Sequence, residues 1–282
     1  MFDPKTSKKI NEFVYQKPRT VQEVAQMLKV NWRTAERYVE RIAQEEGILA
    51  VRTFREGTRG ALKIVFWNNV ERIHATEAQE LLFKRIETGY RKEDFSPFDI
   101  YQFVDAKKKK MRILTDRQYN ADAIIKEYAN LLHSAKSQVM FFSGNLTFST
   151  MASHDEKILS AIEELAEQKV GTKILTRVEI PGLKNIQNVL AANARAGWDA
   201  VEVRHCFQPL RATIVDSSVA FLKEKLYPQN YADGELKEKL YTLYYVYDPE
   251  WIEWLQKVFW HFFRNSVDAK VRIKDLAAAK RV

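Results

Sequence analysis

Three arginines recur at every fourth position in one stretch of the chain: Arg33, Arg37 and Arg41. On an α-helix, positions i, i+4 and i+8 lie on the same face. A guanidinium group can donate two parallel hydrogen bonds, either to O6 and N7 of guanine or to a phosphate. The spacing therefore predicts a helix face that could bind nucleic acid.

The residues at the start of this helix could take part in the same chemistry. Asn31 is a good N-cap, and the side chains of Asn31 and Thr34 can bond to a phosphate or a base edge. Trp32 leaves two interpretations open, because an indole at a helix start either packs on a neighbouring helix or contacts a sugar.

Three helices are predicted to position this face. The third runs from Asn31 to about residue 46, and its opposite side is apolar, with Ala35, Tyr38, Val39 and Ile42. Apolar spacing predicts a first helix over 7–15, and Thr20 with Glu23 forms a capping box that starts a second helix to Leu28. A tight turn between the second and third helices is typical of a helix-turn-helix, whose third helix enters the major groove.

A predicted hairpin follows the helices. Strands are expected over 48–52 and 62–67, with a loop over 56–60 between them. Its arginines, Arg52, Arg55 and Arg59, would face the DNA backbone or the minor groove. Residues 5–68 together resemble the winged helix-turn-helix domains of prokaryotic transcription regulators.

A plainer interpretation of the arginine face also stands. The arginines could pair along a solvated helix face, each pair contributing a few tenths of a kcal/mol. The acidic partners would be Glu36, Glu40 and Glu45.

The charge distribution favours a polyanion partner for the ends of the chain. The 282 residues carry a net charge of +8, and residues 1–70 hold 13 basic against 8 acidic side chains. Residues 121–268 hold 16 basic and 19 acidic side chains, as expected of a nucleic-acid-binding module joined to a different domain. No apolar run is long enough to span a bilayer, and the first residues lack the apolar core of a signal peptide, so we expect a cytoplasmic protein without membrane contact.

The pattern divides the chain into four parts. We expect a winged helix-turn-helix domain over 1–69, a helical linker or dimerisation segment over 70–120, an α/β domain over 121–268 and a basic tail over 269–282. Within the second part, a helix over 77–87 has one apolar stripe that could form a dimer seam or fold back on its own domain. The run Lys107 to Lys110 predicts a solvated linker or turn.

Helices and apolar strands alternate over 121–268, which predicts an α/β fold with parallel strands joined by helical crossovers. The strand Arg211 to Asp216, with the apolar strand after it, resembles a phospholipase D-like domain. Active members carry H-x-K-x4-D here, whereas this chain has Pro209 at the histidine position and Arg211 at the lysine position. Without the imidazole nucleophile we expect no enzymatic activity and a structural role for Asp216.

A degenerate phospholipase D-like domain behind a winged helix resembles archaeal TrmB-type regulators. The resemblance implies a DNA-binding transcription regulator that is a homodimer on double-stranded DNA, with the α/β domain serving dimerisation or the sensing of an effector that the sequence does not define. The histidines show no metal-ligand spacing, so neither a metal nor another cofactor is expected. Two alternatives remain: a phospholipase D-type nuclease or phosphodiesterase, and a chromatin-like coat protein indifferent to DNA sequence.

Overall fold

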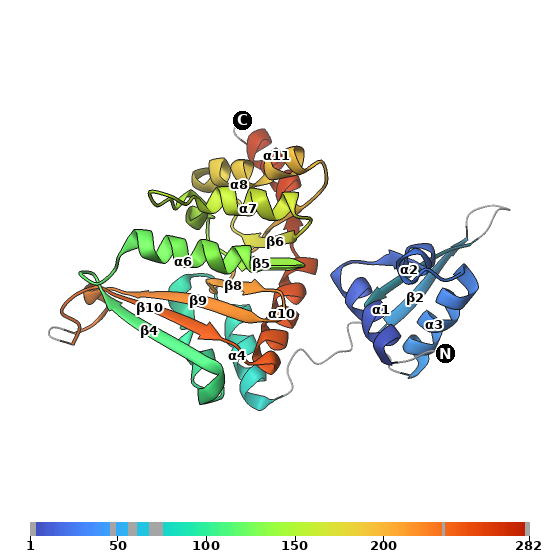
Figure 1. The fold of residues 1–282 in the computed structure, drawn as a ribbon, viewed down its shortest axis with the longest axis horizontal. Coiled ribbons are helices and arrows are strands. Elements are labelled where there is room, and N and C mark those ends of the chain that lie inside the picture. Colours follow the sequence, from blue (N-terminus) through green and yellow to red (C-terminus); the bar gives the residue numbers. More distant parts are fainter. Residues whose placement is uncertain (1–3, 46–48, 56–60, 68–75, 233–234, 280–282) are drawn as a thin grey trace. The chain divides into compact units, whose positions relative to one another are not determined.

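The computed structural model describes residues 4–45, 49–55, 61–67, 76–232 and 235–279. The chain forms two compact units, residues 1–72 and 73–282. Figure 1 shows both as ribbons.

The first unit combines three helices with a small antiparallel sheet (Figure 1). Its elements are α1 (Pro4–Gln16), β1 (Arg19–Thr20), α2 (Val21–Leu28), α3 (Trp32–Glu45), β2 (Leu49–Arg55) and β3 (Ala61–Trp67). The strand order is β1-β3-β2, with β2 and β3 paired as neighbours in sequence. Fully buried aliphatic side chains fill the centre: Ile10, Val24, Val39, Ile42 and Val65.

Local hydrogen bonds explain why α2 begins and ends where it does. The Thr20 hydroxyl accepts from the Glu23 amide at 3.1 Å, and the Glu23 carboxylate accepts from the Thr20 amide at 2.7 Å. The predicted capping box is thus confirmed. At the other end Lys29 has the left-handed φ of +54°, and the Val30 amide donates to the Ala25 carbonyl at 3.0 Å, which closes the turn before α3.

The second unit is built on a mixed sheet of eight strands in the order β11-β7-β6-β5-β8-β9-β10-β4. The strands are β4 (Lys109–Thr115), β5 (Gln138–Phe142), β6 (Gly171–Thr176), β7 (Val201–His205), β8 (Ala212–Val215), β9 (Val219–Leu226), β10 (Leu240–Val246) and β11 (Val267–Asp268). Among the strands that the structure describes, only the β5–β6 and β6–β7 pairs are parallel. The predicted parallel arrangement is therefore confirmed for three strands, and the remaining pairs are antiparallel.

Helices cover both faces of this sheet. The α-helices are α4 (Glu77–Thr88), α5 (Phe98–Tyr101), α6 (Ala121–His133), α7 (Ile158–Glu167), α8 (Leu183–Leu190), α9 (Ala192–Ala196), α10 (Pro249–Arg264) and α11 (Ala269–Ala279). Short 3-10 turns are η1 (Lys92–Asp94), η2 (Ala106–Lys108), η3 (Thr147–Thr150), η4 (Ile180–Gly182) and η5 (Pro228–Asn230). Side chains of α6, α7 and α8 share one core with the sheet, while α10 packs on β5, β6 and β8 with Phe259 5.2 Å from the ring of Phe142.

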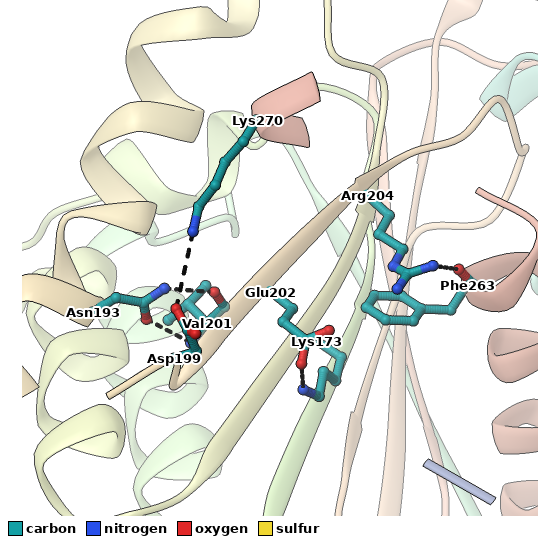
Figure 2. A network of polar contacts seen from close by, with 8 residues as sticks. All are labelled: Lys173, Asn193, Asp199, Val201, Glu202, Arg204, Phe263 and Lys270. Carbon is teal, nitrogen blue, oxygen red and sulfur yellow. Dashed lines mark hydrogen bonds and ion pairs between the residues drawn. The ribbon is translucent and has the colours of Figure 1, made fainter. Parts of the chain in front are cut away.

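Polar contacts tie β7, the strand beside the edge strand β11, to the neighbouring helices, as Figure 2 shows. Asn193 on α9 exchanges two hydrogen bonds with the backbone of Val201, at 2.7 and 2.8 Å. Arg204 donates to the Phe263 carbonyl at 2.9 Å and lies 4.6 Å from the centroid of the Phe263 ring. These bonds join β7 to α9 on one side and to the end of α10 on the other.

The segment before the alternating region belongs to this second unit. In α4, Leu82 and Ile86 are buried, and the neighbouring Phe83 meets the ring of His261 on α10 at 5.1 Å. The apolar stripe therefore folds back on its own unit at these positions, whereas Leu81 is 56% exposed. The expectation of a linker or turn at Lys107–Lys110 is wrong for its second half, because Lys109 starts the edge strand β4.

The residues expected to form a basic tail continue as α11, whose Ala269 is buried. Within the described residues, no helix is both long and apolar enough to cross a membrane.

Candidate nucleic-acid interface

Helix α3 has two different faces. Ala35, Val39 and Ile42 are fully buried, which fixes the rotation of the helix about its axis. Arg33 and Arg37 lie one turn apart on the exposed side. Burial of the apolar stripe thus determines that these two guanidinium groups face solvent.

The start of α3 forms an open depression on the surface. The Asn31 side-chain oxygen accepts a hydrogen bond from the Thr34 amide at 2.8 Å, so Asn31 is the N-cap that the sequence predicts. Trp32 is 38% exposed. The depression is lined by Asn31, Trp32, Arg33, Thr34 and Arg37.

The acidic residues of α3 are engaged elsewhere. Glu36 and Glu40 both form ion pairs with Lys63 on β3, the Glu40 pair at 3.1 Å. The hydrogen bond to Glu36, followed by the one to Glu40, raises the pKa of Lys63. Lys63 thereby draws both carboxylates toward the hairpin.

Two of these arginines have no carboxylate partner among the residues that the structure describes. In the described part of the chain, neither Arg33 nor Arg37 forms an ion pair with a carboxylate, and Arg37 lies 5.9 Å from the centroid of the Tyr38 ring. The plainer interpretation, pairing with the helix's own glutamates, is therefore wrong for these two residues. Arg41 is also exposed and has an interaction within the chain.

The hairpin arginines are placed only in part. Arg52 is exposed on β2 opposite Ile64 and has an interaction within the chain. Arg55 is the last residue of β2, opposite Ala61, while Arg59 lies outside the described residues. Contact of these arginines with DNA stays a prediction.

A second concentration of polar groups lies where β5 and β6 end and β8 begins. Arg177, directly after β6, donates from its backbone amide to the Gly144 carbonyl at 2.9 Å. Arg211, directly before β8, donates to the Leu210 carbonyl at 2.6 Å, and a Cβ on Gly144 would come within 2.6 Å of its guanidinium group. Burial, and then the charge of Arg177, lowers the pKa of Arg211 to about 10.

His205 lies at the end of the adjacent strand β7. Its Nδ1 accepts a hydrogen bond from the Val178 amide at 2.9 Å, which identifies Nδ1 as unprotonated and leaves the proton of the neutral ring on Nε2. Burial, together with the nearby charge of Arg272, lowers the pKa of His205. This imidazole is therefore neutral at neutral pH.

Asp216 has the structural role that the sequence predicts. Its carboxylate accepts hydrogen bonds from the amides of Lys136, Ser137 and Gln138, at 2.9, 3.0 and 2.8 Å, and from the Ser137 hydroxyl at 2.7 Å. Burial raises the pKa of Asp216, but these hydrogen bonds outweigh it and the net shift is downward. The aspartate thereby joins the β8–β9 hairpin to the loop before β5.

The search of protein-family models and the search of curated proteins each gave no match. Among solved structures, the chain is similar to Nuc, a phospholipase D family member from Salmonella typhimurium, with 15% identity and a TM-score of 0.38 over 57% of this chain and 98% of that one. It is similar to TrmBL2, an archaeal chromatin protein described with a novel mode of DNA binding, with 12% identity and a TM-score of 0.40 over 93% of each chain. It is also similar to NucT from Helicobacter pylori, with 13% identity and a TM-score of 0.40 over 57% of this chain and 99% of that one.

These comparisons correct one expectation. The missing histidine at Pro209 led us to expect that the chain is not an enzyme, yet phospholipase D family members are among the structures similar to it. The exclusion of an enzyme is therefore withdrawn. In the described part of the chain, no three His, Cys, Asp or Glu side chains lie close enough together to hold a metal ion.

Two contributors were missed at the sequence level. Lys63 was counted only as part of a strand, although it removes the glutamates from the arginine face. Arg177 was not singled out, because only the fold brings it beside Arg211. The available signal for Lys63 was a lysine in the second strand after a helix that carries two glutamates at i and i+4. No local signal existed for Arg177.

Proposed function

We propose that the protein is a DNA-binding transcription regulator whose first unit is a winged helix-turn-helix, with α3 in the major groove and the β2–β3 hairpin as the wing. The observation that carries this proposal is the exposed pair Arg33 and Arg37, which no carboxylate neutralises in the described part of the chain. Guanidinium groups without a carboxylate partner can bond to guanine edges or phosphates without first losing an internal ion pair.

The residues at the interface take different roles in this proposal. Arg33 and Arg37 contact bases, and Thr34 and Trp32 contact the backbone beside them. Asn31 positions α3, since its side-chain oxygen already caps the helix. The hairpin arginines and Arg41 add phosphate contacts: Arg41, Arg52, Arg55 and Arg59.

The second unit holds two copies together in this proposal. A two-fold dimer presents two α3 helices one helical turn of DNA apart, so its target is a palindrome. Sedimentation of the full chain gives its mass, and a dimer is the expected result.

The first test is a selection of bound sequences from random duplex DNA by the full-length protein at two salt concentrations. We expect a palindromic motif and an affinity that falls steeply as salt rises, because phosphate contacts release counterions. Salt-sensitive binding without any motif would instead favour a coat protein indifferent to sequence. Absence of binding would remove the proposal.

Single substitutions assign the helix that reads the sequence. Arg33→Ala and Arg37→Ala should each cost about 1–3 kcal/mol of binding free energy and relax sequence preference at one position of the motif. Lys126→Ala is the matched control, since it removes one exposed positive charge from α6 in the other unit. Equal affinities of all three variants and the parent would show that α3 does not contact DNA.

A second candidate function is phosphodiester hydrolysis by the second unit. It is favoured by Arg177 and Arg211, which lie together at the ends of strands where ligands bind in α/β sheets. His205 lies at the end of the neighbouring strand β7, and its Nε2 would supply the nucleophile. A generic phosphodiester tests it: turnover that disappears in His205→Ala and Arg211→Ala supports this candidate, and no turnover by the parent protein removes it.

A further inference from the structure

A compact group of lysines and tyrosines lies at one corner of the eight-stranded sheet, and one of its members, Lys223, donates from its backbone amide to the Arg211 carbonyl at 3.4 Å. Three ammonium nitrogens surround one ring: those of Lys239, Lys223 and Lys225 lie 4.7, 5.5 and 5.5 Å from the centroid of Tyr241. No two of them can therefore be further apart than twice 5.5 Å. We call the whole group the Lys–Tyr cluster; it comprises Lys92, Lys223, Lys225, Lys239, Tyr119, Tyr227 and Tyr241.

The sheet register brings this cluster together. Lys223 and Lys225 alternate along β9 and so project from the same face. Tyr241 on β10 pairs with Lys225, and the Tyr119 ring, just before α6, stacks on Tyr241 at 3.8 Å. Figure 1 shows the end of β9, the start of β10 and the start of α6 at one corner of the unit.

The remaining members extend the cluster along the surface. The Tyr227 ring lies 5.1 Å from the Lys92 ammonium and 5.6 Å from that of Lys239. Each lysine thus lies over at least one tyrosine ring, and cation–π attraction helps to hold the ammonium groups close together.

Positive charge exceeds negative charge in the cluster. Four ammonium groups are accompanied by Asp116, 3.8 Å from Lys239, and by Glu93, 3.5 Å from Lys92. Lys223 and Lys225 form no ion pair with a carboxylate within the residues that the structure describes. The excess of two positive charges matches a dianion better than a single carboxylate.

Lys223 and Tyr119 are the groups best placed to meet an anion. Lys223 donates to the Tyr119 hydroxyl at 2.6 Å, and this hydroxyl donates to no acceptor in the described residues, so its proton is available. Burial, and then the charge of Lys239, lowers the pKa of Lys223 to about 8. A bound anion would stabilise the charged form of Lys223 against both effects.

We propose that the Lys–Tyr cluster binds a phosphate group, with Lys223, Lys225 and Lys239 contributing positive charge and Tyr119 donating a hydrogen bond. Lysine ammonium groups bind phosphate as point charges, and a phosphate monoester carries close to two negative charges at neutral pH. The phosphate belongs either to a free phosphorylated molecule, whose monoester group is itself a dianion, or to DNA, in which two neighbouring diester groups carry one charge each. This inference does not depend on the DNA-binding proposal, because it concerns a different unit and different residues.

Calorimetric titration of the full chain with inorganic pyrophosphate tests the site. At pH 7 and about 0.1 M salt, we expect one pyrophosphate per chain and at least tenfold weaker binding by Lys223→Met and by Lys225→Met. Lys126→Met, an exposed lysine on α6, should bind like the parent. Lys225 is itself exposed, so its replacement leaves the fold intact and keeps the test valid if Lys223→Met is poorly folded.

The thermal midpoint separates a binding role from a structural one. If the lysines serve binding, Lys223→Met should melt no lower than the parent, since it removes a half-buried charge that has no carboxylate partner. Equal pyrophosphate affinity in the parent and in both cluster variants would overturn the proposal. So would the absence of pyrophosphate binding.

Duplex DNA in the same titration distinguishes the two sources of phosphate. A free ligand is indicated when Lys225→Met loses pyrophosphate affinity but keeps its duplex affinity. DNA phosphate is indicated when Lys225→Met loses affinity for both and pyrophosphate competes with the duplex. Both outcomes support a phosphate site in the cluster.

Discussion

The two units expose positive charge in different ways. On α3, Arg33 and Arg37 lie on the exposed side of the helix, and Lys63 holds Glu36 and Glu40 in ion pairs. In the Lys–Tyr cluster, Lys223 is half-buried between tyrosine rings, on a strand whose partners fix its position. The first arrangement suits a long polyanion that approaches from outside, and the second suits a single compact anion.

The difference also lies in what holds each set of charges in place. Helix α3 is positioned by the Asn31 cap and by the turn at Lys29, both local in sequence. Strand β9 is positioned by Asp216, whose bonds reach residues 78 to 80 positions earlier in the chain. Local interactions thus position the helix that carries the arginine face, although the ion pairs of Lys63 with Glu36 and Glu40 reach across the unit, and long-range interactions define the Lys–Tyr cluster.

The largest expected effect is a loss of duplex affinity when the arginine face is changed, measured together with the pyrophosphate affinity of the same variant. The double variant Arg33→Glu/Arg37→Glu should bind its duplex at least a hundredfold more weakly, because each arginine contributes about 1–3 kcal/mol and each glutamate adds repulsion. Its pyrophosphate affinity should equal that of the parent. Fluorescence anisotropy with a labelled duplex and calorimetry with pyrophosphate measure the two affinities.

The double variant Lys223→Met/Lys225→Met gives the reciprocal measurement. We expect it to lose pyrophosphate and to keep duplex affinity within about twofold. A comparable loss of duplex affinity in both double variants would contradict the division of roles, since both surfaces would then serve one polyanion.

The next largest effect is on the stability of the second unit. Asp216→Ala should lower the free energy of unfolding by about 3 kcal/mol, because it leaves three backbone amides without the charged acceptor that they have in the native fold. Asp216→Asn keeps the shape and one acceptor oxygen, so its loss should be smaller. Urea unfolding followed by tryptophan fluorescence measures both, and equal stability of parent and Asp216→Ala would show that the hairpin is held by its packing alone.

Acid should weaken the attachment of the β8–β9 hairpin to the loop before β5. The pKa of Asp216 in the folded protein is lowered below its ordinary value of 3.8. The stabilisation of the fold by its carboxylate is therefore present above about pH 4 and is lost as the pH falls through the pKa of the folded state. The parent should therefore lose more stability between pH 5 and pH 3 than Asp216→Asn does. Parallel acid profiles for the two proteins would contradict this role of the carboxylate.

Much of the first unit could be predicted because its determinants are close in sequence. The capping box of Thr20 and Glu23, the Asn31 cap and the buried stripe of α3 each depend on residues within a few positions. The same is true of α10, where Asp248 caps the helix by accepting from the Glu250 amide at 3.1 Å.

The second unit was harder to predict because its contacts are distant in sequence. Strand β4 has a basic and weakly alternating sequence, and only its pairing with β10, in which Thr115 lies opposite Leu240, makes it a strand. The Lys–Tyr cluster depends on the same register. Its one local signal was the alternation of Lys223 and Lys225, which places both on one face of a strand.

The smallest expected effect concerns the turn that leads into α3. Lys29 adopts a left-handed backbone, φ +54°, that glycine tolerates better than other residues, so Lys29→Gly should raise the free energy of unfolding of the first unit by about 0.5 kcal/mol. Lys29→Ala is the matched control, because it removes the same charge and keeps the strained backbone. Thermal melts of the two variants measure the difference. If Lys29→Gly is no more stable than Lys29→Ala, the turn carries no strain, and the position of α3 depends on the Asn31 cap and the buried stripe alone.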